Sequence, residues 1–346
     1  MKSDVKRTAR RRRGAGWASL PAQQLLDVRI CDLSLKLEAT PLAARVERLH
    51  GELERAGLRL RPDVWLSTAW FSPDGVPGFA VPFYLAHPRL AALERVHMFE
   101  VEGGTRASFA RLLRHEAAHA LDHAYRLHRR HDWRQVFGKA SAPYRRGYVP
   151  RPGSRRYVHH LDRYYAQSHP IEDFAETFAV WLGSRGRWRR EYEGWPALRK
   201  LEYVDALMQE VRDTAPAVRA RDRIETLPTV RLTLREYYRR RRSTWGDADL
   251  RVYDRDLARL FGNGARGKRA SVFLRARRAS LRTQVARWTG QRPFVVDEVL
   301  TGMIRRSRDL GLRLAHGERE TAEGAAVLVA MHTLRIRRMR YREYVR

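Results

Sequence analysis

The stretch His115-Glu116-Ala117-Ala118-His119 decides which fold and chemistry the sequence favours. Residues four apart on a helix lie one above the other, so both imidazoles can reach one metal ion. Glu116 can then act as general base on a water molecule bound to that ion. Two histidines and a carboxylate at this spacing are typical of zinc peptidases. The motif therefore predicts a metal-dependent hydrolase that uses Zn2+.

The residues on both sides of the motif favour a helix. Residues 108–114 and 117–124 carry apolar side chains at helical spacing and contain neither Gly nor Pro. Thr105 is the expected N-cap. The motif would thus lie in the middle of a helix, where two histidines and a glutamate are costly without partners. The alternative is a solvated or hydrogen-bonded helix face.

A catalytic zinc ion needs a third protein ligand and an open position for water. The metzincin continuation is excluded, because Asp122 stands at its Gly position and Tyr125 at its last His position. His123 lies eight residues beyond His115, about 12 Å along the helix axis, which is too far to share the metal. The third ligand must therefore come from further along the chain.

Residues 169–182 offer two carboxylates at helical spacing. Pro170 suits the first turn of a helix, and Glu172 and Glu176 would share one face of that helix. We expect Glu172 to be the third zinc ligand. One turn later, Glu176 would accept the second N–H of a ligand histidine. The alternative is a pair of surface carboxylates, which favour helix N-termini in any case.

His131, two residues before Trp133, is the other candidate for the third ligand. This arrangement resembles the SprT/Spartan proteases, which act on DNA–protein crosslinks and in which a His shortly before an aromatic residue completes the site. Residues 126–130 contain no obvious turn residue that would return the chain to the metal. We therefore favour Glu172 and keep His131 as the alternative.

The pair Glu172 and Glu176 downstream of the motif resembles the gluzincin pattern, and most closely the anthrax lethal factor and Pro-Pro endopeptidase group. In that group a Tyr seven residues before the ligand Glu points at the metal. Tyr165 stands at this offset, so the resemblance implies that Tyr165 stabilises the transition state. The alternative is a packed aromatic side chain at the edge of the core.

A longer part of the chain, roughly residues 25–240, resembles a bacterial family of zinc-binding metallopeptidases. This resemblance implies an α+β, zincin-like metallopeptidase domain and says little about the substrate. The motifs that carry it are Ile30-Cys31-Asp32-Leu33, residues 71–77, residues 83–88, Glu102-Gly103-Gly104-Thr105 and residues 165–170.

The sequence is expected to divide into three parts. Residues 1–22 read as a disordered basic arm. Residues 23–215 form the zincin-like metallopeptidase domain, with a small sheet and the active-site helix. Residues 216–346 have helical periodicity and read as an all-helical, basic C-terminal extension. The boundary near residue 215 follows from a Pro that ends a helical stretch.

The expected metallopeptidase domain begins with a helix over residues 41–58 and strands over residues 64–70, 79–85 and 96–101. Zinc peptidases commonly bind a peptide substrate by backbone pairing along a sheet edge. The strand that ends at Val101, directly before the active-site helix, is the expected edge.

The composition sets the remaining limits. Lys and Arg outnumber Asp and Glu by 69 to 39, a formal net charge of +30, which suits a nucleic acid partner but also arises from an Arg-rich composition without any binding role. Cys31 is the single cysteine, which excludes an internal disulfide framework. We find no secretory signal and no membrane span. These features favour a cytoplasmic protein without a membrane partner.

The function expected from the sequence is a zinc metallopeptidase of gluzincin type acting on a peptide or protein substrate. Two alternatives stay open at this point. One is a SprT-like, DNA-associated protease with His131 as the third ligand. The other is a non-enzymatic, nucleic-acid-associated protein with a structural metal site.

Overall fold

The computed structural model describes residues 16–144, 151–243, 250–264 and 267–340. The chain divides into two compact units. Unit 1 comprises residues up to Glu94 together with Val101–Arg235, and unit 2 comprises Arg95–Glu100 together with the residues from Glu236 onward. Among the described residues, no helix is both long and apolar enough to cross a membrane.

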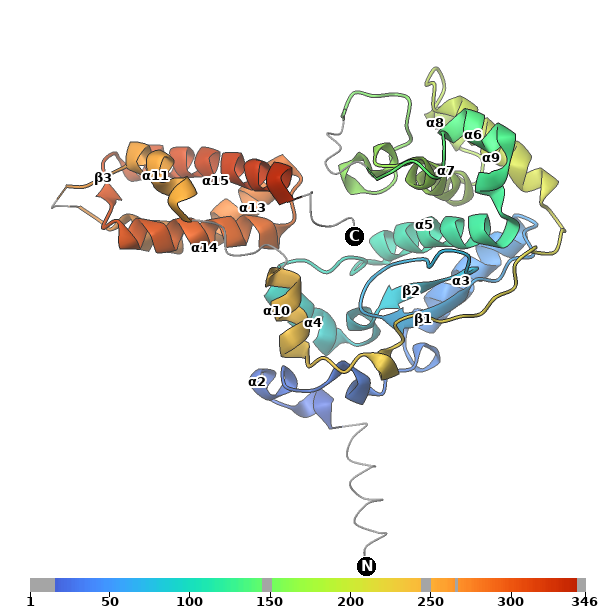
Figure 1. Ribbon diagram of the computed structural model, residues 1–346, viewed down its shortest axis with the longest axis horizontal. Coiled ribbons are helices and arrows are strands. Elements are labelled where there is room, and N and C mark those ends of the chain that lie inside the picture. The colour runs from blue at the N-terminus through green and yellow to red at the C-terminus, as the bar shows by residue number, and fades with distance from the viewer. Residues whose placement is uncertain (1–15, 145–150, 244–249, 265–266, 341–346) are drawn as a thin grey trace, which may run out of the picture. The chain divides into compact units, whose positions relative to one another are not determined.

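Unit 1 is an α+β structure in which helices surround a two-stranded sheet (Figure 1). Its elements, in chain order, are η1 (Trp17–Ser19), α2 (Ala22–Leu25), η2 (Ile30–Leu33), η3 (Leu37–Ala39), α3 (Leu42–Arg55), β1 (Asp63–Ser67), β2 (Gly78–Pro82), η4 (Phe83–Ala86), α4 (Pro88–Met98), α5 (Arg106–Tyr125), η5 (Leu127–Arg129), α6 (His131–Phe137), η6 (Asp162–Gln167), α7 (Pro170–Ser184), α8 (Trp188–Glu191), α9 (Leu198–Glu210) and η7 (Leu227–Thr229). Two helices belong to both units: α4 passes from unit 1 to unit 2 after Glu94, and α10 (Leu234–Ser243) does so after Arg235.

The sheet of unit 1 is small and buried. Strands β1 and β2 run parallel, in a register that pairs Asp63 with Gly78 and Ser67 with Pro82. Every residue of β2 is buried. The connection between the strands also returns along β2, where the N–H of Ala80 donates to the carbonyl oxygen of Phe71 at 2.8 Å. The strands predicted over residues 64–70 and 79–85 thus exist but are shorter.

The third predicted strand, over residues 96–101, is wrong because this region ends a helix. Pro88 opens α4, where a proline suits the first turn. Leu90, Leu93 and Met98 are buried at helical rather than alternating spacing, whereas Val96 is 65% exposed. The sheet edge that we expected to bind a peptide is therefore absent from this position.

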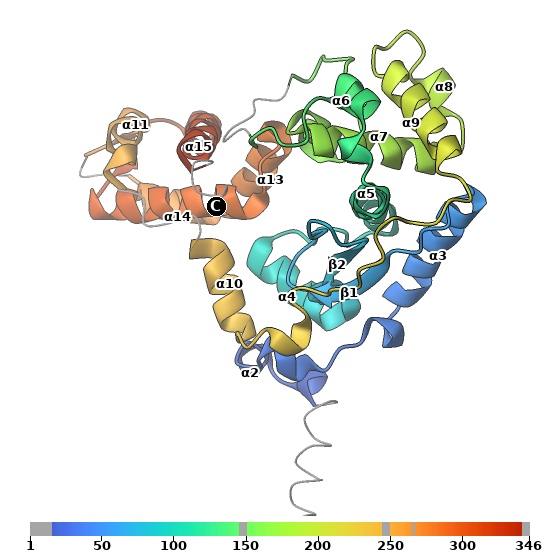
Figure 2. The same ribbon diagram turned by 45° about the vertical axis from the view of Figure 1, so that its right-hand side comes forward.

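Helix α5 is the central element of unit 1. In both views it runs between the β1–β2 sheet with α3 on one side and α7 on the other (Figures 1 and 2). Thr105 caps its N-terminus as predicted, because its side chain accepts from the N–H of Ser108 and the Ser108 hydroxyl accepts from the N–H of Thr105. Arg114 forms a two-pronged ion pair with Glu52 of α3, with N–O distances of 2.7 and 2.8 Å. These contacts hold α5 in register with its neighbours.

The segment 216–235 completes unit 1, so the boundary predicted near residue 215 lies inside this unit. The N–H groups of Ile30 and Cys31 donate to the carbonyl oxygens of Leu232 and Val230 at 2.9 and 3.0 Å. Further along, the buried Ser67 hydroxyl donates to the carbonyl oxygen of Glu225 at 2.7 Å. A proline that ends a helix thus marks a turn in the chain and not the end of a domain.

Packed structure in unit 1 also begins closer to the N-terminus than predicted. Trp17 is buried, and its indole N–H donates to the carbonyl oxygen of Leu33 at 3.1 Å. Its ring packs edge-on against His87, with the ring centroids 4.8 Å apart. The predicted disordered arm, residues 1–22, is therefore wrong from Trp17 onward, and residues 1–15 lie outside the described residues.

Unit 2 is a helical bundle with its own apolar core. Its elements are η8 (Leu250–Tyr253), α11 (Asp254–Leu260), β3 (Phe261–Gly262), α12 (Ala270–Ala276), α13 (Arg278–Thr289), α14 (Pro293–Asp309), β4 (Arg313–Leu314) and α15 (Glu318–Arg340). Strands β3 and β4 pair antiparallel, so the extension predicted as all-helical contains a minimal two-stranded sheet. The helical periodicity was otherwise predicted correctly.

The contacts of residues 216–235 predict that the amides of Ile30 and Cys31 exchange slowly with solvent. Their partner carbonyls belong to residues 230–232, so exchange requires that this segment detach from the N-terminal part of unit 1. Hydrogen exchange read by NMR or mass spectrometry on the full chain measures this. If residues 216–235 were a linker, both amides would exchange at the rate of an unprotected peptide.

Candidate metal centre

Two helices supply the polar residues of the site. Helix α5 carries the histidine pair and Glu116, and α7 carries Glu172 and Glu176. Pro170 begins α7, as predicted, and the N–H of Ile171 donates to the His169 ring, which caps the helix. Because α5 and α7 pack side by side, residues 53 to 61 positions apart meet between them.

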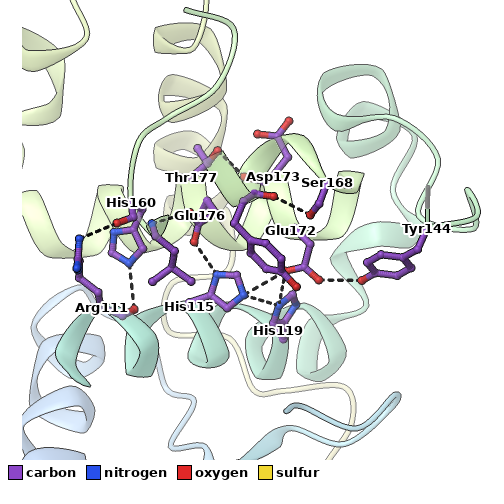
Figure 3. A network of polar contacts seen from close by, with 12 residues as sticks. Arg111, His115, His119, Tyr144, His160, Ser168, Glu172, Asp173, Glu176 and Thr177 are labelled. Atoms are coloured by element: carbon purple, nitrogen blue, oxygen red, sulfur yellow. Dashed lines mark hydrogen bonds and ion pairs between the residues drawn. The ribbon is translucent and has the colours of Figure 1, made fainter. Parts of the chain in front are cut away.

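Three donor atoms lie at the corners of a nearly equilateral triangle (Figure 3). The Nε2 atoms of His115 and His119 are 3.1 Å apart. The Oε2 atom of Glu172 lies 3.1 Å from the first and 3.3 Å from the second. Tetrahedral zinc with bonds of about 2.0–2.2 Å needs ligand atoms about 3.3–3.5 Å apart. The observed distances differ from that by only a few tenths of an ångström.

The burial of these atoms also suits a metal ion. His115 and Glu172 are only 3% and 6% exposed. The Oε2 atom of Glu172 is buried and faces both Nε2 atoms, but it accepts a well-directed hydrogen bond from neither. A buried carboxylate oxygen without a hydrogen bond is costly, and a cation in the triangle would remove that cost. The residues therefore fit a metal ion.

Glu176 orients one of the imidazoles. It is fully buried, and its Oε1 atom lies 2.8 Å from Nδ1 of His115. Its other oxygen accepts from the backbone N–H of Leu161 at 2.8 Å. Because a carboxylate can only accept, Nδ1 of neutral His115 carries the proton and Nε2 presents a lone pair to the triangle. Glu176 thus lies where the sequence analysis expected it.

The close packing of charged groups at the site shifts the pKa values of His115 and Glu172. Burial lowers the pKa of His115, but the neighbouring carboxylates of Glu172 and Glu176 outweigh burial and raise that pKa well above its ordinary value. Burial raises the pKa of Glu172, yet the charges of His119 and His115 hold it well below its usual range. The carboxylate of Glu172 therefore stays ionised and available as a ligand.

Glu116 lies beside the triangle on α5 and is 6% exposed. Burial raises its pKa, and the charges of His115 and His119 oppose part of that rise. A general base is most effective when its pKa approaches the working pH. A buried carboxylate next to the metal donors has the chemical character of such a base.

Tyr165 and Tyr144 both lie at the site. The ring of Tyr165 packs against that of His115, with the centroids 5.7 Å apart. The hydroxyl of Tyr144 donates to Oε1 of Glu172 at 2.8 Å, and its ring stacks on His169 with the centroids 4.0 Å apart. Tyr144 was not predicted, because it precedes Glu172 by 28 positions and no spacing rule relates residues so far apart.

The other candidate ligands lie outside the triangle. His131, the first residue of α6, is exposed. His123 accepts through Nδ1 from the N–H of Gly75 at 3.2 Å. Asp122 is buried, and its Oδ1 atom accepts from the backbone N–H of His128 at 2.7 Å. Its Oδ2 atom lies 3.0 Å from Nδ1 of the His128 ring, and the two contacts close the turn after α5. Within the described residues, the group that could hold a metal contains Glu172 and not His131.

Comparison of the chain with known protein families, characterised proteins and solved structures finds no match. The chemistry of the site therefore carries the functional argument. Two imidazoles and one carboxylate are the protein ligands of one class of catalytic zinc site, in which the fourth position belongs to water or substrate. Structural zinc sites instead use four protein ligands, most often including cysteines.

Removal of Glu172 is expected to abolish tight metal binding. Loss of an outer partner of a ligand typically weakens metal affinity about 10–100-fold, so Glu172→Gln should cost at least on the order of a hundredfold, and Glu176→Gln about 10–100-fold. His131→Ala is the matched control, since this exposed histidine is expected to leave affinity unchanged. Zinc content by mass spectrometry and competition with a chromophoric chelator measure both. If His131→Ala lost tight zinc binding and Glu172→Gln retained it, the proposed metal site would be contradicted.

Proposed function

We propose that this chain is a zinc-dependent metallopeptidase of gluzincin type, with a zincin-like arrangement of its metal helix. The observation that carries the proposal is the triangle of His115, His119 and Glu172 donor atoms, with Glu116 buried beside it. Three protein ligands leave a coordination position for water, which distinguishes a catalytic from a structural zinc site. The proposed substrate is a peptide bond in a peptide or protein.

In this proposal His115, His119 and Glu172 hold the ion, and Glu176 keeps the His115 ring in the tautomer that binds it. A bound Zn2+ would supply Lewis-acid activation of water and of the substrate carbonyl. Glu116 accepts the proton of the attacking water and passes it to the leaving amine. Each of these roles falls to a side chain on α5 or α7.

Two tyrosines complete the proposed machinery. We assign the oxyanion-stabilising role to Tyr165, whose ring lies against that of a ligand histidine. Tyr144 has a different role, because its hydroxyl already donates to Glu172. That hydrogen bond occupies Oε1 and leaves Oε2 for the metal, so Tyr144 orients the ligand carboxylate.

Partners and compartment belong to the same proposal. With one cysteine in 346 residues the chain cannot form an internal disulfide, which supports a reducing compartment such as the cytoplasm. The SprT-like alternative loses its support, since His131 is exposed and lies outside the metal-binding group. The net charge of +30 does not by itself select a nucleic acid.

Glu116→Gln is expected to remove peptide hydrolysis while the metal stays bound. Loss of a general base typically costs about 10²–10⁴-fold in rate, whereas Glu116 is not a ligand. Cleavage of a combinatorial peptide library, read by mass spectrometry, and zinc content of the same preparation measure the two effects. Glu193→Gln, at an exposed glutamate in the turn after α8, is the control. Unchanged cleavage by Glu116→Gln, or no cleavage by the zinc-loaded wild type, would overturn the proposal.

Phenylalanine substitutions are expected to distinguish the roles of the two tyrosines. Tyr165→Phe should lower kcat about 100-fold and leave zinc affinity unchanged, because the proposed partner of its hydroxyl is the transition-state oxyanion and not a metal ligand. Tyr144→Phe should weaken zinc binding about 10–100-fold, because the ligand carboxylate loses its orienting partner. Tyr125→Phe, whose hydroxyl donates to Thr214 elsewhere, is the control. If instead Tyr144→Phe lowered kcat and Tyr165→Phe weakened zinc binding, the roles assigned to the two tyrosines would have to be exchanged.

A further inference from the structure

A separate pocket of about 220 Å³ lies between α3 and α5 within unit 1. Typical small-molecule sites begin at roughly 300 Å³, so this pocket suits a compact ligand. Its lining residues come from the two helices and from the residue before α3.

The pocket is distinct from the metal centre. Its α5 residues Arg106, Phe109, Ala110 and Leu113 follow each other at intervals of three, one and three, so they share one helix face. At 100° per residue, His115 lies about 180° around the helix from that face. The pocket therefore backs onto the side of α5 that faces away from the metal ligands.

Three arginines give the pocket a strong positive charge. Within the described residues, Arg45, Arg48 and Arg106 form no ion pair with a carboxylate. The carboxylate of Glu52 does not neutralise them, because Arg114 occupies both of its oxygens at 2.7 and 2.8 Å. Burial lowers the pKa of Arg45, and the charges of Arg106 and Arg48 lower it further. Among the described residues, these three like charges thus line one pocket without a carboxylate partner.

The floor of the pocket is apolar and aromatic. Leu49, Phe109 and Leu113 are buried. The guanidinium of Arg45 lies over the ring of Phe109, 5.0 Å from its centroid, and Trp70 packs edge-on against the same ring at 5.4 Å. These contacts hold the Arg45 head group over the apolar floor and limit its freedom to turn out into water.

We propose that this pocket binds a small organic anion, with an oxyanion head held by Arg45, Arg48 and Arg106 and a compact apolar or aromatic body on the floor formed by Leu49, Phe109 and Leu113. Guanidinium groups recognise carboxylate and phosphate oxygens through paired, charge-assisted hydrogen bonds. The apolar body gains from burial that a free inorganic anion cannot use. The ligand would also tie α3 to the first half of α5 and so stabilise the fold.

Calorimetric titration and thermal unfolding of the full chain test this proposal with simple probes. Phenyl phosphate and benzoate carry the proposed head and body, inorganic phosphate carries the head alone, and phenol carries the body alone. We expect phenyl phosphate or benzoate to bind one site per chain and to raise Tm, and the better of the two identifies the head group. Inorganic phosphate should bind at least about tenfold more weakly, and phenol should not bind. Ionic strength is held constant, because charged contacts weaken with salt.

Arginine variants connect this binding to the pocket. Arg48→Ala and Arg106→Ala, both at exposed positions, are expected to fold normally and to lose about tenfold or more in affinity, as expected for a lost charge-assisted hydrogen bond. Arg199→Ala, an exposed arginine on α9, is the matched control and should bind like the wild type. The proposal is overturned if no organic anion shows saturable binding, or if Arg199→Ala loses as much affinity as the pocket variants. The test requires neither a metal nor catalysis.

Discussion

The interface between α5 and α7 must satisfy several charged groups that have no access to water. His115, Glu172 and Glu176 are each at most 6% exposed, and unpaired charges at such depth cost several kcal/mol each. Small buried side chains near these groups by helical spacing, Ala118 on α5 and Ala179 on α7, let the two helices approach closely. Glu176 pairs with His115 across this interface, and the carboxylate of Glu172 lies against both histidines of α5. A metal ion would complete that pairing at the remaining oxygen of Glu172.

Local spacing explains what could be predicted from the sequence. The helix around His115, its Thr105 cap and the helix that begins at Pro170 all follow from residues within one or two turns of each other. The relation between Glu172 and Glu176 is equally local, so their shared face could be predicted. The α+β class followed from the same patterns, although the sheet is smaller than expected.

Contacts between distant parts of the chain explain what was missed. Val96 and Val101 favour a strand by composition, but burial of Leu90 and Leu93 against unit 1 favours a helix. Tyr144 contacts Glu172 from 28 positions earlier in the chain, and the arginine pocket joins residues of α3 to residues about 60 positions later. Neither relation leaves a repeat or a fixed offset in the sequence.

Because the ribosome synthesises the chain from its N-terminus, residues 216–235 are made after the helices that carry the proposed metal donors. The ribosome completes α5 and α7, with every proposed metal donor, about fifty residues before Arg235 supplies the last contacts of unit 1. At about 5–20 residues per second this interval lasts several seconds. During that time the nascent chain contains all the proposed metal donors, but the last segment of unit 1 is not yet available to pack against the rest. Ion capture can therefore precede the last folding step and favour the pairing of α5 with α7 as the chain emerges.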